Sequence, residues 1–373
     1  MEQHAILSPQ TKKPPFRADQ VGSLLRSERI KKARAQKAAG EITADQLRLI
    51  EDEEIARIVA KQKEIGLQAV TDGEFRRAWW HFDFLENLDG VEGFEPEKGL
   101  QFHQRETKNH GIKVVGKLDF SDHPMLKDFK YLYSLAGSHT AKMTIPSPSM
   151  LHLRGTFEKD VYDDKEEFFH DLAQAYQKAI RAFYDAGCRY LQLDDTSWGA
   201  LCSAEKREEM RAQGVDPDQL SATYMKLIND AVAERPDDMT ITMHICRGNY
   251  RSTWFSSGGY EPVAEVLFEG LNIDAFFLEY DSDRAGGFEP LRFVNRPDLK
   301  IVLGLITSKV GELENPDDIK RRIDEASHYV DLNQLCLSPQ CGFASTEEGN
   351  LLTEEQQWAK LRHVIEIAQD VWK

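Results

Sequence analysis

The sequence has few cysteines, a shortage of positive charge and no long hydrophobic run. Its five cysteines are odd in number and irregularly spaced, which argues against a disulfide framework and favours a reducing compartment. The formal net charge of −16 would repel a phosphate backbone, so we expect no nucleic-acid partner. Apolar stretches stay under ten residues, so we also expect no membrane span.

The N-terminal stretch lacks the apolar segment of a secretory signal, so a cytoplasmic location is the simplest expectation. At 373 residues and 41% hydrophobic content, the chain can bury a substantial core. We expect one catalytic domain over residues 1–373, with an N-terminal extension at 1–15 and an insertion at about 90–138. The expected partners are small-molecule substrates, and association of like chains stays open.

Short apolar runs alternate with helical patterns along most of the chain. The runs that predict strands are 17–23, 68–75, 141–148, 189–196, 239–248, 274–281, 300–308 and 332–342. Helical patterns follow them at 28–39, 43–66, 165–186, 218–235, 262–269, 289–295, 316–330 and 353–372. Eight strand–helix repeats predict an α/β fold of the (β/α)8 TIM-barrel class. An open doubly wound sheet would need a Gly-rich phosphate turn after the first strand, and GSLLRS is not one.

Polar residues recur at the ends of these predicted strands, where TIM barrels place their active sites. They include Ser23, Asp72, Glu74, Ser147, Asp194, Asp195, His244, Cys246, Glu279, Asp281, Thr307, Ser308, Gln340 and Cys341.

Four of these residues form a candidate metal site. His244 and Cys246 are two apart on a predicted strand, so both side chains point the same way. Glu279 ends the next strand, and Cys341 ends the eighth strand across the barrel mouth. An imidazole, two thiolates and a carboxylate are ligands that bind zinc tetrahedrally. Each residue alone is more often structural, but four potential ligands at three strand ends favour a metal site.

The charge of this ligand set indicates the chemistry. Two thiolates and a carboxylate carry −3, so a Zn²⁺ site would be about −1 overall. Such a site suits a substrate thiolate better than a polarised water, which favours alkyl transfer to sulfur over hydrolysis. Glu279, a hard oxygen among soft sulfurs, is the ligand expected to give way to a substrate thiol.

The remaining residues of interest have simpler interpretations. Cys188, Cys202 and Cys336 lie in apolar surroundings and are expected in the core. Residues 79–82, Trp-Trp-His-Phe, would either line a ligand pocket near the barrel mouth or form core beneath a loop.

The motifs HIC, LEYDSDRAG and SPQCGF together resemble the cobalamin-independent methionine synthase family. The resemblance extends upstream to VGSLLRS, TDGEFRR, IPSPSMLH and LQLDDTS, and covers about residues 15–373. The chain is similar to the C-terminal catalytic barrel of that family, in a single-barrel form. The resemblance implies a zinc-dependent methyltransferase in which homocysteine thiolate attacks the methyl group of a methyltetrahydrofolate-type donor, giving methionine.

The resemblance also implies roles for individual residues. His244, Cys246, Glu279 and Cys341 match the zinc ligands, and Glu279 and Asp194 are the expected catalytic residues. Ser23, Glu74 and Asp194 match positions that bind the amino and carboxylate groups of homocysteine. An ammonium group is well matched to two nearby carboxylates, which agrees with the placement of Glu74 and Asp194 at strand ends.

Three departures concern the methyl-donor side. The chain has one barrel where the full-length synthase has two. Met150-Leu151 is followed by His152, where the family has a tryptophan that stacks on the pterin. Thr307-Ser308 stands where the family has a proposed proton-donating histidine. His152 and Asp195 are the two candidates to replace that histidine as proton donor.

Two other functions fit the metal motif. Relatives that transfer alkyl groups to coenzyme M keep the His-x-Cys and Cys ligands but bind a sulfonate, which the paired acids Glu74 and Asp194 would repel. A non-catalytic zinc-storing or thiol-sensing protein would not need Ser23, Glu74 and Asp194. A donor other than folate is compatible with either transfer reaction.

Overall fold

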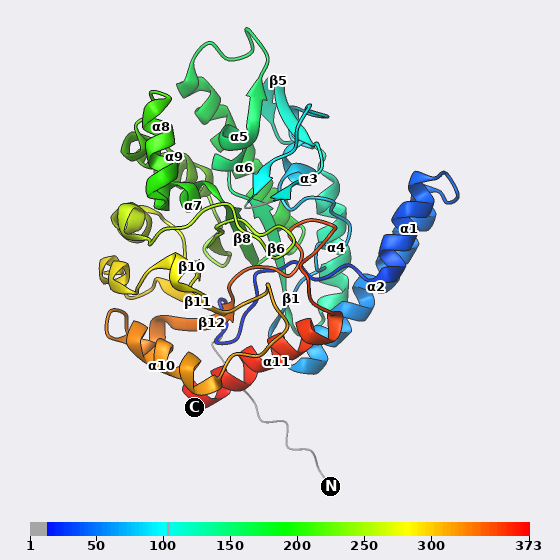
Figure 1. Ribbon diagram of the computed structural model, residues 1–373. Coiled ribbons are helices and arrows are strands. Elements are labelled where there is room, and N and C mark those ends of the chain that lie inside the picture. Colours follow the sequence, from blue (N-terminus) through cyan, green and yellow to red (C-terminus); the bar gives the residue numbers. More distant parts are fainter. Residues whose placement is uncertain (1–12, 103–104) are drawn as a thin grey trace.

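The computed structural model describes residues 13–102 and 105–373, so the expected extension at 1–15 lies almost wholly outside the described residues (Figure 1). Its centre is a curled, all-parallel sheet of seven strands in the order β1-β6-β8-β9-β10-β11-β12. The strands are β1 (Ala69–Val70), β6 (Thr140–Pro146), β8 (Tyr190–Asp195), β9 (Thr240–Ile245), β10 (Ala275–Glu279), β11 (Lys300–Ile306) and β12 (Leu335–Pro339). Seven of the eight predicted strands therefore occur, in the predicted order.

The predicted strand at 17–23 is reduced to one parallel bridge, between Ala18 and Leu337 of β12. On its other side, the Leu24 N–H donates to the Gly73 carbonyl at 3.0 Å, beyond the end of β1. Regular pairing stops because the Asp19 carboxylate accepts from the Phe16 and Gln20 N–H groups at 3.0 and 2.8 Å. Side chains that bind nearby backbone in this way compete with a sheet ladder.

β1 is short for the same reason. The Thr71 N–H donates to Gln62 Oε1 at 2.9 Å, and the Glu74 N–H donates to Asp72 Oδ1 at 2.8 Å. The predicted strand at 68–75 therefore turns away from the sheet after Val70, and its polar end forms a tight loop.

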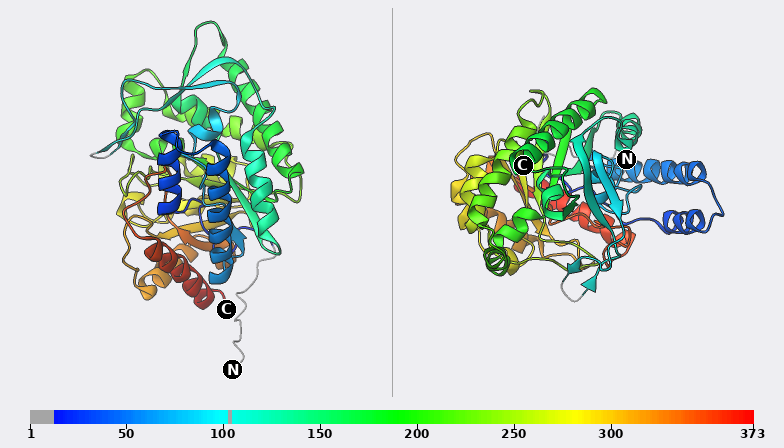
Figure 2. Two further views of the ribbon diagram at one scale, coloured as in Figure 1. Left: turned by 90° about the vertical axis from the view of Figure 1, so that its right-hand side faces the viewer. Right: turned by 90° about the horizontal axis from the view of Figure 1, so that it is seen from above.

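Long helices surround the sheet: α2 (Ala44–Ile65), α4 (Pro124–Ala136), α6 (Lys165–Asp185), α9 (Pro217–Val232), α10 (Pro316–Ser327) and α11 (Glu354–Val371). A further helix, α1 (Glu28–Ala38), packs on α2. α2 begins with a capping box between Thr43 and Gln46 and ends at Gly66, whose φ of 99° is left-handed. The paired helices α1 and α2 project to one side of the molecule (Figure 2).

Shorter helices fill the connections: α3 (Phe82–Leu85), α5 (Ser149–Arg154), α7 (Ser197–Cys202) and α8 (Ala204–Ala212). The helix predicted at 262–269 is a 3₁₀ turn, Glu261–Val263, followed by a π turn, Val266–Gly270. The helix predicted at 289–295 is a 3₁₀ helix, Glu289–Phe293, and the remaining 3₁₀ turns are Asp283–Ala285 and Leu332–Gln334.

The segment around 90–138 contains both strands and a helix. β2 (Asp89–Phe94) pairs antiparallel with β5 (Gly111–Asp119), which pairs in parallel with β7 (Gly155–Phe157). The short strands β3 (Gln101–Phe102) and β4 (Arg105–Glu106) form a separate pair. α4 packs against α2 and β6, so it belongs to the outer layer of the main sheet, while β5 packs on α6.

The sheet interior is filled near the start of its strands. Tyr190, Phe277, Val302 and Cys336 form a buried cluster there together with Phe16, Val21 and Ala69. Cys188 and Cys202 are also buried, as expected of core cysteines. The opposite, carboxyl ends of the strands are left to polar residues. No helix among the described residues has both the length and the apolar character to cross a bilayer.

Candidate metal centre and substrate cavity

The structure brings together four potential ligand atoms at the carboxyl ends of the strands. His244 lies on β9, and Cys246 is the first residue after that strand. Glu279 is the last residue of β10. Cys341 lies two residues beyond the end of β12. One ligand atom from each residue lies within 4.8 Å of all the others, and all four residues are buried.

The two sulfur atoms have the spacing of ligands to one ion. The Sγ atoms of Cys246 and Cys341 are 3.6 Å apart. Two thiolates bound to a tetrahedral zinc at about 2.3 Å lie about 3.8 Å from each other. The Gly248 N–H donates to the Cys246 sulfur at 3.3 Å, as it would to a thiolate.

The nitrogen and oxygen ligands are oriented by backbone groups. His244 Nδ1 lies 3.3 Å from the Phe277 carbonyl, which leaves Nε2 to face the site. The Arg247 N–H donates to Glu279 Oε1 at 2.8 Å. His244 Nε2 and Glu279 Oε2 are buried without a hydrogen-bond partner. Buried atoms left in this state are costly, and a bound cation would satisfy both.

Protonation within the four ligands is coupled. A hydrogen bond from Cys246 and the nearby His244 hold the pKa of the Cys341 thiol well below its usual range, against the effect of burial. Burial raises the pKa of Glu279. Cys341 is therefore the readier of the two thiols to lose its proton.

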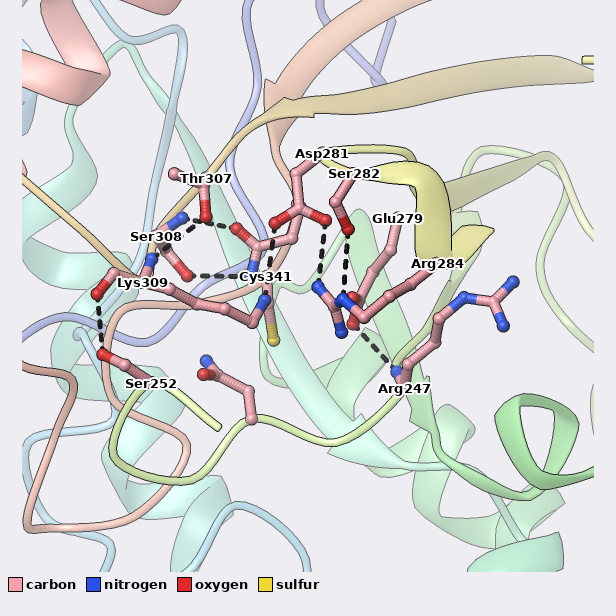
Figure 3. A network of polar contacts seen from close by, with 12 residues as sticks. Arg247, Ser252, Glu279, Asp281, Ser282, Arg284, Thr307, Ser308, Lys309 and Cys341 are labelled. Atoms are coloured by element: carbon pink, nitrogen blue, oxygen red, sulfur yellow. Dashed lines mark hydrogen bonds and ion pairs between the residues drawn. The ribbon is translucent and has the colours of Figure 1, made fainter. Parts of the chain in front are cut away.

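A positive side chain that the sequence did not suggest lies beside the ligands. Lys309 follows β11, and its ammonium lies 3.5 Å from Asp281, which also pairs with Arg284 at 3.4 Å (Figure 3). The Lys309 charge lowers the pKa of both Glu279 and Cys341. Its position after a predicted strand end was the available signal, because such ends face the barrel mouth.

The three residues matched to homocysteine binding line the same cavity as the metal ligands. Ser23, Glu74 and Asp194 share this cavity with His244, Cys246 and Cys341. All three are buried, with at most 6% of their surface exposed. The Glu74 side chain accepts a hydrogen bond from Thr144 at 3.0 Å through Oε1, and its Oε2 has no hydrogen-bond partner.

The backbone of Glu74 is strained. Its φ is 59°, a left-handed value that residues other than glycine seldom adopt. Strain of this kind costs about 1–3 kcal/mol and tends to persist where a side chain must be aimed at a function. The Arg77 guanidinium lies 3.8 Å from Glu74 Oε2 and offsets part of the energetic cost of burying that carboxylate.

The carboxyl of Asp194 is also held in an unusual state. Burial raises its pKa to about 7, and the neighbouring Glu74 acts in the same direction, whereas His244 and the hydrogen bond from Gln192 lower it. Gln192 Nε2 donates to Asp194 Oδ1 at 2.7 Å. A cation placed between Asp194 and Glu74 would therefore relieve two carboxylates that repel each other.

The Ser23 hydroxyl lies directly against the backbone of Gly342. A Cβ atom on Gly342 would lie 1.9 Å from Ser23 Oγ, so only glycine fits beside that hydroxyl. Ser23 Oγ accepts from the Ala344 N–H at 3.3 Å. The Ser23 hydroxyl is therefore fixed against the segment that follows Cys341.

The aromatic cluster after Glu74 divides between cavity and core. Trp79, Trp80 and His81 line the cavity together with Phe102 and Phe255. Phe82 belongs to the hydrophobic core alone, whereas Trp79 belongs to both the core and the cavity lining. The pocket interpretation is thus confirmed for three of the four residues.

The two candidate proton donors lie elsewhere. His152 Nδ1 is 2.8 Å from the Tyr224 hydroxyl, and burial lowers the pKa of His152 to about 4. Asp195 accepts from the N–H groups of Ser197 and Trp198 at 2.5 and 3.2 Å and so caps α7. Neither residue lines the described part of the cavity.

A sequence model of one family, described as "Cobalamin-independent synthase, Catalytic domain", matches residues 16–370. The chain belongs to this family. The resemblance inferred from the sequence motifs is therefore confirmed, and in a single-domain form.

Close relatives of this family member cover nearly its whole length. It is 69% identical over 365 residues to the uncharacterized protein YxjG of Bacillus subtilis (strain 168), across 98% of this chain and 97% of that one. A crystal structure of a putative vitamin-B12-independent methionine synthase from Listeria monocytogenes has 55% sequence identity and a TM-score of 0.82. It covers 97% of this chain and 100% of that chain.

A more distant structure supports the fold alone. A B12-independent methionine synthase from Shewanella sp. W3-18-1, in complex with selenomethionine, has 18% identity and a TM-score of 0.70. It covers 94% of this chain and 96% of that chain. The curled parallel sheet is thus an architecture that this chain shares with a synthase of distant sequence.

Proposed function

We propose that the protein transfers a methyl group from a methyltetrahydrofolate-type donor to the thiol of homocysteine, giving methionine. One observation carries this proposal: four potential zinc ligands converge, and three of them line the same cavity as two acids suited to an amino acid's ammonium. The homocysteine sulfur bonds to the methyl carbon, the bond from that carbon to its donor atom breaks, and the electron pair stays on the donor atom, which must then be protonated.

The ligand set fits zinc. The paired sulfurs, the free Nε2 of His244 and the free Oε2 of Glu279 are soft and borderline donors that converge in a buried place. Zinc bound there would stabilise the homocysteine thiolate while leaving it nucleophilic. Glu279 is the ligand we expect to be displaced by that thiol, because its oxygen is the hardest donor of the four.

The chain's own residues hold the amino acid. Glu74 and Asp194 receive the ammonium group, and their burial excludes water from that contact. Ser23 offers its hydroxyl to the carboxylate. Fixing the ammonium and the carboxylate in this way orients the sulfur toward the ligand atoms at the cavity floor.

An alternative is alkyl transfer to another thiol, as in coenzyme M transferases, or transfer from a donor other than folate. The paired acids disfavour the first, since a sulfonate beside Glu74 and Asp194 would be repelled. The absence of the family's tryptophan after Met150-Leu151 leaves the second open.

X-ray absorption at the zinc edge tests the proposal directly. We expect about one zinc per chain in the purified protein and an additional sulfur neighbour on addition of homocysteine. A spectrum that does not change at saturating homocysteine would remove homocysteine as the acceptor. Coenzyme M, added in a parallel experiment, should leave the spectrum unchanged, and a new sulfur neighbour with that compound would favour the alternative.

A further inference from the structure

Lys309 has a buried ammonium group that makes no hydrogen bond among the described residues. Its side chain is 9% exposed, and its Nζ atom has no hydrogen-bond partner there. Figure 3 shows the side chain directed toward Asp281, with which it forms an ion pair at 3.5 Å. A charged hydrogen bond would be shorter, at about 2.7–2.9 Å. A buried donor left in this state is costly, so an acceptor that reached it would be held firmly.

The charges around Lys309 do not cancel. Asp281 also pairs with Arg284 at 3.4 Å, so two cations share one carboxylate. Arg284 Nη1 is likewise buried without a hydrogen bond among the described residues. Lys309, Asp281 and Arg284 therefore carry one positive charge in excess, and together they can receive one more carboxylate.

Glu279 is the carboxylate beside this excess charge. Burial raises the pKa of Glu279, and the Lys309 charge opposes that effect more than any other neighbouring charge does. Glu279 Oε1 accepts from the Arg247 N–H at 2.8 Å, whereas Oε2 has no partner among the described residues. The free oxygen can bind a metal ion or, after the side chain turns, the Lys309 ammonium.

The backbone is held in place on both sides of this contact. Glu279 pairs with Gly304 in the ladder between β10 and β11, and its carbonyl accepts from the Tyr260 hydroxyl at 3.2 Å. The Lys309 carbonyl accepts from the Ser252 hydroxyl at 2.7 Å. A change of partner by the Glu279 carboxylate therefore needs only rotations of its own side chain.

Displacement by a substrate thiol creates a need for such a partner. The incoming thiolate takes the ligand position that the Glu279 carboxylate leaves, and the thiol's proton passes to solvent. One anion replaces another among the ligands, so their total charge is unchanged. The released carboxylate, however, stays in a buried place, where an ionised group without a counter-charge is strongly destabilised.

We propose that Lys309 is a positioning residue, which binds the Glu279 carboxylate after a substrate thiol has displaced it from the metal. The carboxylate then exchanges one cation for another, and it does not compete with the thiolate for its former position. Lys309 thus favours thiol binding through Glu279, without contacting the substrate. This inference rests on the proposed function, because it assigns a role in binding the thiol substrate of the same site.

Calorimetric binding of homocysteine to the zinc-loaded protein tests this role. Lys309→Met keeps much of the side chain and removes its charge, whereas Lys309→Arg keeps the charge. Glu279→Gln puts in place of the carboxylate a neutral amide, which can leave the metal without creating a buried charge. The double variant Lys309→Met/Glu279→Gln completes the cycle. Lys226→Met, at a mostly exposed position on α9, is the control.

We expect Lys309→Met to bind homocysteine roughly 10- to 100-fold more weakly than the wild type, the range of a lost charged hydrogen bond. Lys309→Arg should recover most of that loss, and Lys226→Met should show none. With Gln at position 279, the further change Lys309→Met should alter the affinity by less than about twofold, because no charged carboxylate has to be received.

Two results would overturn the inference. The first is undiminished homocysteine affinity in zinc-loaded Lys309→Met. The second is a loss that is as large in the Glu279→Gln background as in the wild type, since Lys309 would then act on the thiolate itself. If Glu279→Gln does not retain zinc, Glu279→Ala takes its place in the cycle, because three protein ligands are enough for a catalytic zinc site.

Zinc content is measured on every preparation. A wild type that holds no zinc, or that does not bind homocysteine, would refute the proposed function. A wild type that does both would confine the failure to the role of Lys309.

Discussion

Replacing Asp194 by asparagine should separate substrate binding from metal binding. Asp194 has one carboxylate oxygen committed to Gln192 and the other free for a ligand, and it lies in the cavity without belonging to the ligand cluster. A hydrogen bond between a carboxylate and an ammonium contributes about 1.5–3 kcal/mol, so Asp194→Asn should weaken homocysteine binding by about 10- to 100-fold. Zinc content should not change.

The assay compares two thiols by calorimetry on the zinc-loaded protein. Homocysteine carries the ammonium group and propanethiol does not, so the variant should lose affinity for the first and keep its affinity for the second. Asp238→Asn, at an exposed position, is the matched control. Undiminished homocysteine affinity in a zinc-loaded Asp194→Asn protein would refute the ammonium role.

The same substitution should stabilise the metal-free fold. Because burial raises the folded-state pKa of Asp194 from 3.8 to about 7, the unfolded chain releases this proton first. Wild-type stability therefore falls as pH rises from about 4 to about 7, and stays lowered above that range. At about 1.4 kcal/mol per pH unit, the total reaches an upper bound of about 4 kcal/mol. Asparagine avoids this loss. Urea unfolding at pH 5 and pH 8 should show a larger gain for Asp194→Asn at about pH 8.

Three further changes test the site. Cys341→Ser should lose most of the bound zinc by metal analysis, while Cys188→Ala, a core change, should keep it; equal zinc in both would contradict the ligand assignment. Gly342→Ala should displace the Ser23 hydroxyl and weaken homocysteine binding several-fold with zinc retained, unlike Gly259→Ala, whose Cβ has room. Removing zinc with a chelator should lower the melting temperature, because the ligand atoms lose their partner, and restoring zinc should reverse the change; a melting temperature indifferent to zinc would argue against a specific site.

The convergence of the four candidate metal ligands could be predicted from sequence because strand position determines where they lie. In a parallel sheet every strand ends at the same edge, so His244, Glu279 and Cys341 meet although they are far apart along the chain. The strand order needed only the alternation of apolar runs and helical patterns. The same reasoning from strand ends predicted that Glu74 and Asp194 lie near these residues, and both line the cavity.

Element lengths were less predictable, since local hydrogen bonds override periodicity. The strand expected at 17–23 is lost to the Asp19 carboxylate, and the one at 68–75 is cut short by Gln62. A pattern of period two does not reveal either contact. In place of the helix expected at 262–269 the chain forms a 3₁₀ turn followed by a wider π turn, and in place of the one at 289–295 it forms a 3₁₀ helix. Both 3₁₀ segments have proline, Pro262 or Pro290, in their first turn.

Arg154, on the wall of the cavity, escaped prediction for a different reason. It ends the short helix α5, two residues beyond the segment IPSPSMLH and away from any predicted strand end, so neither signal includes it. What distinguishes it is that its Nε is buried without a hydrogen bond among the described residues. Only coordinates can reveal that a buried group lacks a partner.

The candidate site contains several buried polar atoms without hydrogen bonds, and these lower the stability of the fold. Glu74 Oε2, His244 Nε2, Glu279 Oε2 and both nitrogens of His81 are buried without hydrogen bonds, and all belong to residues at the cavity or the ligand cluster. At about 1–3 kcal/mol each, they lower stability by an amount comparable to the whole stability of a small domain. The extensive hydrophobic core around the sheet offsets this loss. A bound metal would satisfy His244 Nε2 and Glu279 Oε2, and a bound ammonium would satisfy Glu74 Oε2, so each ligand should stabilise the protein separately.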